Sequence, residues 1–495
     1  MIRFASAVSL ALFAFAAAIA LSAVAMRAGV LFDDTVTLWA EAIAAGDGEI
    51  AIGRIVAAYP TVPFLATTLV EFLAPANTPS PALLAAVLLA LAAGTLMVAL
   101  RDSGVGVFAA LAIAGLIVFH PANLRAVLAG PADMFLMVFL ALLAKGLYDL
   151  RARSSAPDVM TVALALLGMS FSHPMGAAIT IASMPLLALA VRPAVAANSG
   201  LNVVVALIFP SMFAVGAFIY MSWVFPGSGW SFLTAPSASL AAWIADLPRD
   251  MSVQVSGLPV LDVGLLTIVS LALGAPTGFA ALAAIRRRRP LVMPGLVLVA
   301  GVVVGAMMAV ATGAFGSPAA IAVVAPVLAA TVMVRIPDVR ERMPAVLALL
   351  VVGWIGGGMS VLTLDPRLAA QLRGIVNETS DRDKIEALNL GHATAGRQGV
   401  LVDTANAPAV VLGRGHARGL LAPHGEDFQL TMLFARIDAP FVAVPDPQSP
   451  AGAQDQLNRL FPKLHRSGDP SYRLIYQNSR WRLFERKASP SVSID

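Results

Sequence analysis

The chain has 495 residues, of which 58% are hydrophobic and 13% are charged. In soluble domains, roughly a quarter of all residues are charged. The composition therefore indicates a polytopic membrane protein with one polar region near its C-terminal end. The net charge of +4 does not indicate nucleic-acid binding, because the basic residues of the first 364 positions fall in short loops between apolar runs. The absence of cysteine excludes disulfides and thiolate metal sites.

Apolar runs of the length that crosses a bilayer recur along the first three quarters of the chain. They lie near 4–26, 81–100, 105–120, 131–150, 159–172, 175–191, 201–224, 260–285, 291–311, 318–334 and 344–364. The expected fold class is therefore an all-α polytopic membrane protein with about 11 transmembrane helices. The first run also has features of a signal peptide, but its length favours an uncleaved span. The runs 159–172 and 175–191 could form one broken helix.

Basic residues alternate between loops and thereby predict the orientation. Arginines such as Arg101, Arg151 and Arg335, and the run Arg286–Arg289, fall in every second loop. The positive-inside rule places these loops and the N-terminus in the cytoplasm. The loops 27–80, 120–131, 172–175, 224–259 and 312–317 are then extracytoplasmic. We expect a membrane domain over 1–364 and an extracytoplasmic, periplasmic domain over 365–495.

The first outer loop, 27–80, carries two adjacent aspartates, Asp33 and Asp34. Asp34 is expected to cap a helix that starts at Thr35 and ends at Gly46. Its apolar face, with Val36, Trp39, Ala40 and Ile43, predicts a helix that lies flat on the membrane interface, followed by a second one near 50–56. Capping by Asp34 leaves Asp33 as the better candidate for a general base. The apolar stretch 60–73 is expected to be partly inserted.

Further polar residues fall on the same predicted face. His120 and Arg125 follow one span, Asp133 opens the next, and His173 interrupts a hydrophobic region. A His/Asp pair can orient a substrate or relay a proton, and an arginine can bind phosphate. Structural roles compete with these: Asp133 as a helix cap, Arg125 as an interface anchor, and His173 as a partner of a carbonyl freed by the following proline.

The C-terminal region has the composition of a soluble domain. Strands are expected at 399–403, 409–412 and 439–444, a hairpin at 472–476 and 481–484, and helices near 380–390 and 453–463. These predict a small α/β domain. The region contains no glycine-rich phosphate loop, no nucleophile elbow and no metal-ligand motif in its sequence.

Four short motifs occur in a familiar order. They are Phe32-Asp33-Asp34, Tyr59-Pro60-Thr61-Val62-Pro63, His120-Pro121 with Asp133 shortly after it, and Ser172-His173-Pro174. Together with the outer C-terminal domain, this order resembles the GT-C superfamily of membrane glycosyltransferases. Within that superfamily, the order resembles the branch of the protein O-mannosyltransferases and bacterial aminoarabinose transferases, which is glycosyltransferase family 39-like.

The resemblance implies transfer of a sugar from a polyprenyl-phosphate donor, with Asp33 or Asp34 as the catalytic base. In that family, basic residues on later outer loops hold the donor phosphate, and a lysine is often found near the second break. This chain has His173 there, which makes Arg125 and Arg249 the candidate phosphate partners.

The expected partners are the sugar donor, a lipid, glycan or protein acceptor, and membrane lipids, with no nucleic acid. No cofactor is expected, and a divalent metal is left open. The composition suits a bacterial inner membrane. The alternatives are a lipid or solute transporter, and a non-catalytic membrane scaffold whose outer domain recruits partners.

Overall fold

A computed structural model describes residues 2–30, 32–50, 55, 58–74, 78–224, 260–279, 289–315, 318–335, 343–365, 368–370, 382–423 and 425–487. The chain folds into two compact units. We call them the membrane unit, with Met1–Val24, Val56–Pro63 and Ala82–Arg373, and the sheet unit, with Ala25–Ile55, Phe64–Pro81 and Gly374–Asp495. Each unit is described by itself.

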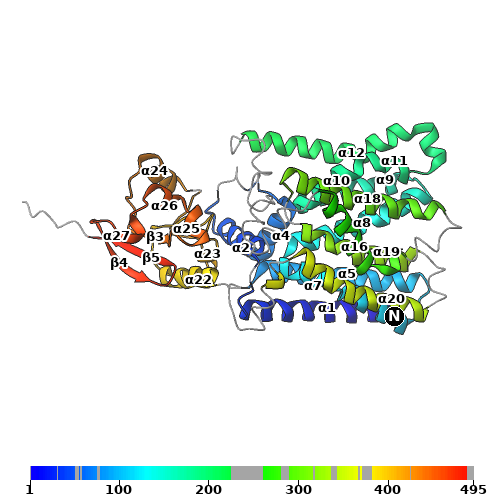
Figure 1. Ribbon diagram of the computed structural model, residues 1–495, viewed down its shortest axis with the longest axis horizontal. Coiled ribbons are helices and arrows are strands. Elements are labelled where there is room, and N and C mark those ends of the chain that lie inside the picture. Colours follow the sequence, from blue (N-terminus) through cyan, green and yellow to red (C-terminus); the bar gives the residue numbers. More distant parts are fainter. Residues whose placement is uncertain are drawn as a thin grey trace, which may run out of the picture. The chain divides into compact units, whose positions relative to one another are not determined.

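The regular elements in the described part of the membrane unit are helices (Figure 1). Its helices are α1 (Ile2–Arg27), α5 (Ser80–Asp102), α6 (Val107–Val118), α7 (Pro121–Ala129), α8 (Pro131–Ala152), α9 (Ala156–Ser172), α10 (Pro174–Ser183), η1 (Met184–Leu186), α11 (Leu187–Ala190), α12 (Pro193–Val224), α16 (Val260–Gly274), α18 (Arg289–Thr312), η4 (Pro318–Val323), α19 (Val324–Arg335) and α20 (Met343–Leu364). A helix lies within each of the predicted apolar runs. The long apolar helices identify a multi-pass membrane protein.

The predicted number of about 11 spans is wrong. Within the described residues, five helices are long and apolar enough to cross a membrane: α1, α5, α12, α18 and α20. The number rises to six if α6 and α7, which meet at a bend of 50°, form one broken span. The predicted number is too high because several apolar runs fold as helices of 10–17 residues, among them α9, α16 and α19. Helices of this length are shorter than a bilayer requires.

The described part of the sheet unit contains five strands: β1 (Val400–Leu401), β2 (Leu420–Leu421), β3 (Phe441–Pro445), β4 (Tyr472–Gln477) and β5 (Trp481–Arg486). They lie in the order β2-β1-β3-β5-β4, with β1 parallel to both β2 and β3. The pairs β3–β5 and β5–β4 are antiparallel. The predicted strand at 439–444 and the hairpin near 472–484 are therefore confirmed, as is the small C-terminal sheet.

The predicted strand at 409–412 is wrong, because this segment forms helix α23 (Ala409–Arg414). The parallel strands β1 and β2 need a crossover connection, and α23 supplies it. Gly415 ends the helix in the left-handed conformation, with a φ of 78°. The local abundance of valine favoured a strand, and the topology of the sheet overrides that preference.

Helices complete the sheet unit. They are α2 (Asp33–Gly46), most of α4 (Thr61–Leu73), α22 (Arg382–Thr394), α24 (Glu426–Phe434), α25 (Pro450–Gln454), α26 (Gln456–Leu460) and α27 (Leu464–Ser467). Helix α22 and the pair α25–α26 lie where helices were expected. The stretch 60–73 is a helix from Thr61 on.

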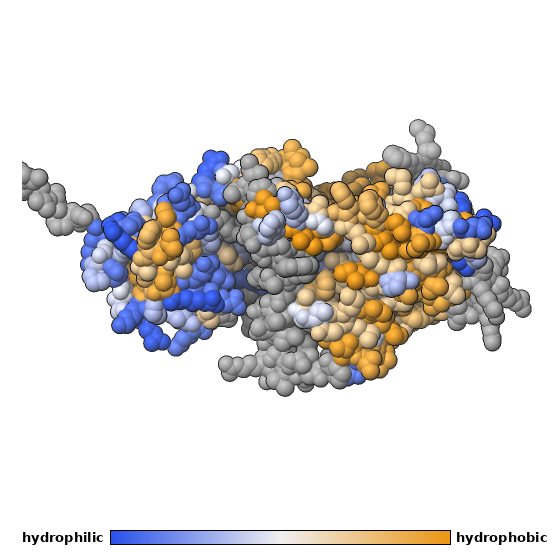
Figure 2. All heavy atoms as spheres, turned by 90° about the horizontal axis from the view of Figure 1, so that it is seen from above, coloured by the Kyte–Doolittle hydropathy of each residue, from blue (hydrophilic) through white to orange (hydrophobic). Residues whose placement is uncertain are grey.

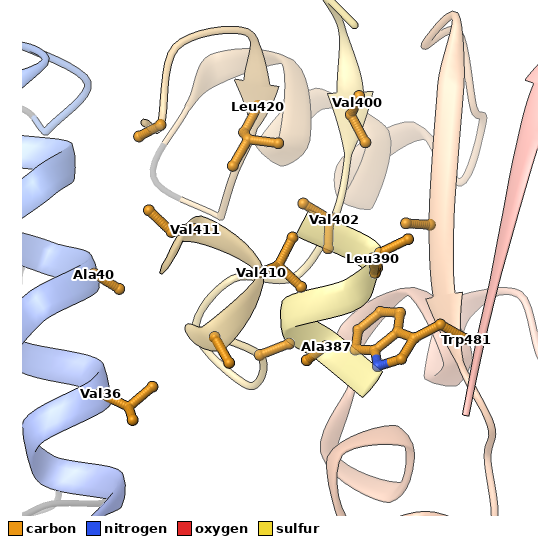
Figure 3. Close-up of a cluster of buried hydrophobic side chains, with 14 of the residues drawn as sticks. Val36, Ala40, Ala387, Leu390, Val400, Val402, Val410, Val411, Leu420 and Trp481 are labelled. Atoms are coloured by element: carbon orange, nitrogen blue, oxygen red, sulfur yellow. The ribbon is translucent and has the colours of Figure 1, made fainter. Parts of the chain in front are cut away.

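Helix α2 belongs to the hydrophobic core of the sheet unit. Val36, Ala40 and Ile43 are buried there together with Val410 and Val411 of α23 (Figure 3). The predicted apolar face is thus present, but it packs against protein and not against lipid. The second helix expected near 50–56 lies largely outside the described residues.

The two units differ in surface polarity (Figure 2). Helices such as α12 expose large apolar side chains, including Phe209, Met212 and Phe213, each more than 60% exposed. Apolar side chains in contact with water are unfavourable, so this surface is suited to lipid. The visible surface of the part of the sheet unit that contains the strands is mostly hydrophilic, with one apolar patch on it.

Candidate functional site

Two His-Pro pairs begin helices in the membrane unit, and both histidines cap the helix that follows. The Nδ1 atom of His120 accepts a hydrogen bond from the backbone N–H of Ala122 at 3.2 Å. The Nδ1 atom of His173 accepts from the N–H of Met175 at 3.0 Å. Proline at the first helical position fits both helices, because its missing N–H would have no intrahelical partner there. Each histidine therefore has a structural role as an N-cap.

The cap fixes the tautomer of His173. An Nδ1 atom that accepts a hydrogen bond carries no proton, so the proton of the neutral ring lies on Nε2. That Nε2 atom is 3.1 Å from Oδ1 of Asp133, to which it donates. The helix break thus orients an imidazole N–H towards a buried carboxylate.

Arg125 completes this group from α7. Its Nη1 contacts Oδ2 of Asp133, and its Nε is 2.8 Å from Oδ2 of Asp365, the residue that follows α20. All four side chains are buried, with residue exposures between 3% and 8%. We call Arg125, Asp133, His173 and Asp365 the break cluster.

The charges of the break cluster do not cancel. One guanidinium faces two carboxylates, and His173 is neutral in the tautomer that caps its helix. Carboxylates desolvated in this way need close cationic or N–H partners, and Arg125 and His173 supply them. Three of the predicted substrate-binding residues, Arg125, Asp133 and His173, thus lie together in the structure. Two nitrogens of Arg125 already bind protein carboxylates.

His120 takes part in a different contact. Its Nε2 lies 3.2 Å from the carbonyl oxygens of Gly274 and Gly353, on α16 and α20. A Cβ atom added to Gly357 would overlap the imidazole ring. His120 therefore joins three helices through a site that needs glycine, and it is not a member of the break cluster.

A second ionic group lies near the other end of α8. Asp149 is within 3.3 Å of the cationic groups of Lys145, Arg153 and Arg335. Sixteen residues separate Asp133 from Asp149, which corresponds to about 24 Å along a helix axis. The basic loops that contain Arg153 and Arg335 thus meet at one end of α8, and the break cluster lies at its other end.

The two first-loop aspartates belong to the sheet unit. Helix α2 begins at Asp33 and its N-cap position is Phe32, so the predicted capping by Asp34 is wrong. Both aspartates lie in the first turn, where negative charge is favourable near the helix N-terminus. Asp33 forms an ion pair with Lys384 of α22 at 2.7 Å, and Asp34 is exposed.

The far end of α2 is fixed as well. Oδ2 of Asp47 accepts from the N–H of Ala417 at 2.7 Å, and Oδ1 is 3.1 Å from Nε of Arg418. Ionic contacts at both ends and an apolar face between them hold the start of α2 in a defined position within the sheet unit.

One predicted site residue cannot be placed, and one residue of the break cluster was not predicted. Arg249 lies outside the described residues. Asp365 was missed by the sequence reasoning, although an aspartate directly after the last apolar run was a signal that could have found it. No group of three or more histidine, aspartate or glutamate side chains within the described part of the chain could hold a metal ion.

No protein-family model matches the chain, and no curated protein matches it significantly. The fold and the break cluster define the class: a multi-pass helical membrane protein with buried ionic residues at helix breaks and a small mixed α/β unit.

Proposed function

We propose that this protein is a membrane glycosyltransferase of the GT-C kind. It would transfer a sugar from a polyprenyl-phosphate donor to a lipid, glycan or protein acceptor on the extracytoplasmic side of a bacterial inner membrane. The proposal rests on the order of the four motifs and on the structural setting of the residues within them.

The main support for this proposal is the pair of aspartates, Asp33 and Asp34, in the first turn of α2. Glycosyl transfer needs a base that takes the proton of the acceptor hydroxyl, and a positioned carboxylate can do this. Asp34 is exposed on a helix that both its ends and its apolar face hold in place. We assign the base to Asp34. Asp33, through Lys384, would position the helix start.

The break cluster supports a role for the membrane unit in donor binding. Ionised side chains within membrane segments are costly and usually mark functional sites. Arg125 binds two separate carboxylates through Nη1 and Nε, and a guanidinium is also a good partner for phosphate. We propose that Asp133 and Asp365 hold Arg125 ready for the donor phosphate, with His173 orienting Asp133.

The two ionic groups of α8 support the proposed sidedness. Basic loop residues gather around Asp149, whereas the break cluster, with His173, lies at the opposite end of the helix. This separation agrees with a cytoplasmic end rich in arginine and an extracytoplasmic end that carries the break cluster.

A second candidate function is transport of an ion or a lipid. Discontinuous helices with buried charged residues at the break are typical of transporters, and the break cluster has this character. It carries more carboxylate than cation, which suits a proton or cation pathway.

Transfer assays separate the two functions. Purified protein in detergent is incubated with a panel of radiolabelled polyprenyl-phosphate sugars, and loss of label from the donor is measured. Transfer by wild type that Asp34→Asn abolishes would support the glycosyltransferase. If wild type and Asp34→Asn consumed the donor equally well, Asp34 would not be the base. No donor consumption, combined with ion flux in proteoliposomes that Asp133→Asn abolishes, would support transport.

A further inference from the structure

The strand order of the sheet unit places two aspartates, which have no part in the proposed transfer reaction, beyond the carboxyl ends of β1 and β3. The chain leaves β1, forms β2 on one side of it, and then returns to form β3 on the other side. Such a reversal makes the carboxyl ends of β1 and β3 a topological switch point, where α/β sheets bind ligands. Asp403 follows β1 by two residues, and Asp455 lies between the helices that follow β3.

Both aspartates meet at the start of α26. Oδ2 of Asp403 accepts from the N–H of Gln456 at 3.0 Å and from Nδ2 of Asn406 at 2.7 Å. Oδ1 of Asp455 accepts from the N–H of Asn458 at 2.7 Å. Two carboxylates therefore share the first turn of one short helix, which draws them close together.

Their other oxygens have no hydrogen-bond partner among the residues that the structure describes. Oδ1 of Asp403 and Oδ2 of Asp455 are both buried and unsatisfied, and the residues are 0% and 1% exposed. Within the described part of the chain, no cationic side chain forms an ion pair with either carboxylate. Two buried carboxylates without a cation cannot both remain ionised at small cost, because desolvation penalises each charge and the two charges repel.

The electrostatic surroundings agree with this argument. Burial, reinforced by the charge of Asp403, raises the pKa of Asp455 to about 7. The hydrogen bonds from the start of α26 and the charge of Arg459 act in the opposite direction and are outweighed.

We propose that Asp403 and Asp455 form a proton-binding site, in which a proton on the unsatisfied oxygen of Asp455 removes the repulsion between the two buried carboxylates and so keeps the loop after β1 on the start of α26. The pH dependence has a defined sign. The folded pKa of Asp455 lies above its unfolded value of about 4, so the folded state holds the proton more tightly. The stabilisation is complete below about pH 4 and is lost as the pH rises through about 7.

Hydrogen exchange on the full-length protein in detergent tests this site. Peptides over 450–460 are followed by mass spectrometry from about pH 5 to about pH 8, after correction for the intrinsic exchange rate. We expect protection of this segment to fall at least several-fold as the pH rises through 7. Asp455→Asn, which mimics the protonated carboxyl and keeps a good N-cap, should remove this pH dependence. Asp427→Asn, an exposed aspartate of α24, is the control and should leave the profile unchanged.

Two results would overturn the proposal. One is a pH dependence of this segment that persists in Asp455→Asn. The other is protection of the wild-type segment that is constant with pH but is lost on chelation and restored by calcium or magnesium, which would show that a metal ion, and not a proton, neutralises the pair. If Asp455→Asn does not fold, difference infrared spectroscopy of wild type decides: the proposal expects a carboxylic-acid C=O band to disappear as the pH rises through 7. Absence of that band would contradict it.

Discussion

The ammonium of Lys384 lies 2.7 Å from the carboxylate of Asp33, and this contact joins the first turn of α22 to the first turn of α2. A segment of the first predicted outer loop is therefore part of the same compact unit as the C-terminal sheet. The position of Asp33 and Asp34 depends on the folding of residues near position 400, which lie far away in the sequence.

Truncation of the apolar face of α2 should destabilise the sheet unit. We expect Ile43→Ala to lower its free energy of unfolding by about 2–4 kcal/mol, because it removes a buried side chain and leaves a cavity. Limited proteolysis across 382–487 measures the effect in the full-length protein. Leu433→Ala is the control: this leucine of α24 is 74% exposed, and its truncation should cost less than about 0.5 kcal/mol. Equal protease resistance of Ile43→Ala and wild type would contradict the packing described for α2.

Two neighbouring glycines of α20 should respond differently to alanine. In Gly357→Ala, the added methyl group overlaps the imidazole of His120, so we expect a loss of about 1–3 kcal/mol from overpacking. In Gly358→Ala, the nearest atom is 3.7 Å away, on Pro121, and the helix gains propensity. Thermal unfolding in detergent compares the two. A Gly357→Ala variant as stable as Gly358→Ala would show that His120 does not pack against this face of α20.

The break cluster should be sensitive to loss of its cation. Arg125→Leu leaves Asp133 and Asp365 buried without their guanidinium partner, at an expected cost of about 3–5 kcal/mol. Combination with Asp133→Asn and Asp365→Asn should recover most of that loss, because the uncompensated charges disappear.

Arg153→Leu is the matched control for this series. Arg153 also contacts two aspartates, but its side chain is 62% exposed, so water screens these ion pairs and its removal should change the stability little. If the triple variant were no more stable than Arg125→Leu alone, the ionic account of the cluster would fail.

Some of this structure could be predicted from the sequence. The hairpin around residues 472–484 alternates apolar and polar side chains and has its turn residues between the strands, so local pattern sufficed. The apolar face of α2 was also visible from its helical period, but its partner was not. Periodicity shows that a face is buried and does not show whether lipid or protein buries it.

Only part of the break cluster could be predicted from the sequence. Pro121 and Pro174 made both breaks predictable, and the adjacent histidines were natural candidates for a site. Their role as N-caps depends on a backbone N–H two residues on, and only the geometry shows it. Asp365 lies 240 residues from Arg125 in the chain, and no local pattern connects the two.

We propose that an aspartate at the start of α2 is the base of a glycosyl transfer from a polyprenyl-phosphate donor. The most direct measurement is the initial rate of donor consumption by purified wild type, Asp34→Asn, Asp33→Asn and, as the exposed-acid control, Asp438→Asn. General-base catalysis contributes typically about 10²–10⁴-fold, so we expect a loss of rate of that size in Asp34→Asn and an unchanged rate in Asp438→Asn. Asp33→Asn should lose less, because it would disturb the helix start and leave the base in place. A wild-type rate in both Asp33→Asn and Asp34→Asn would contradict the claim.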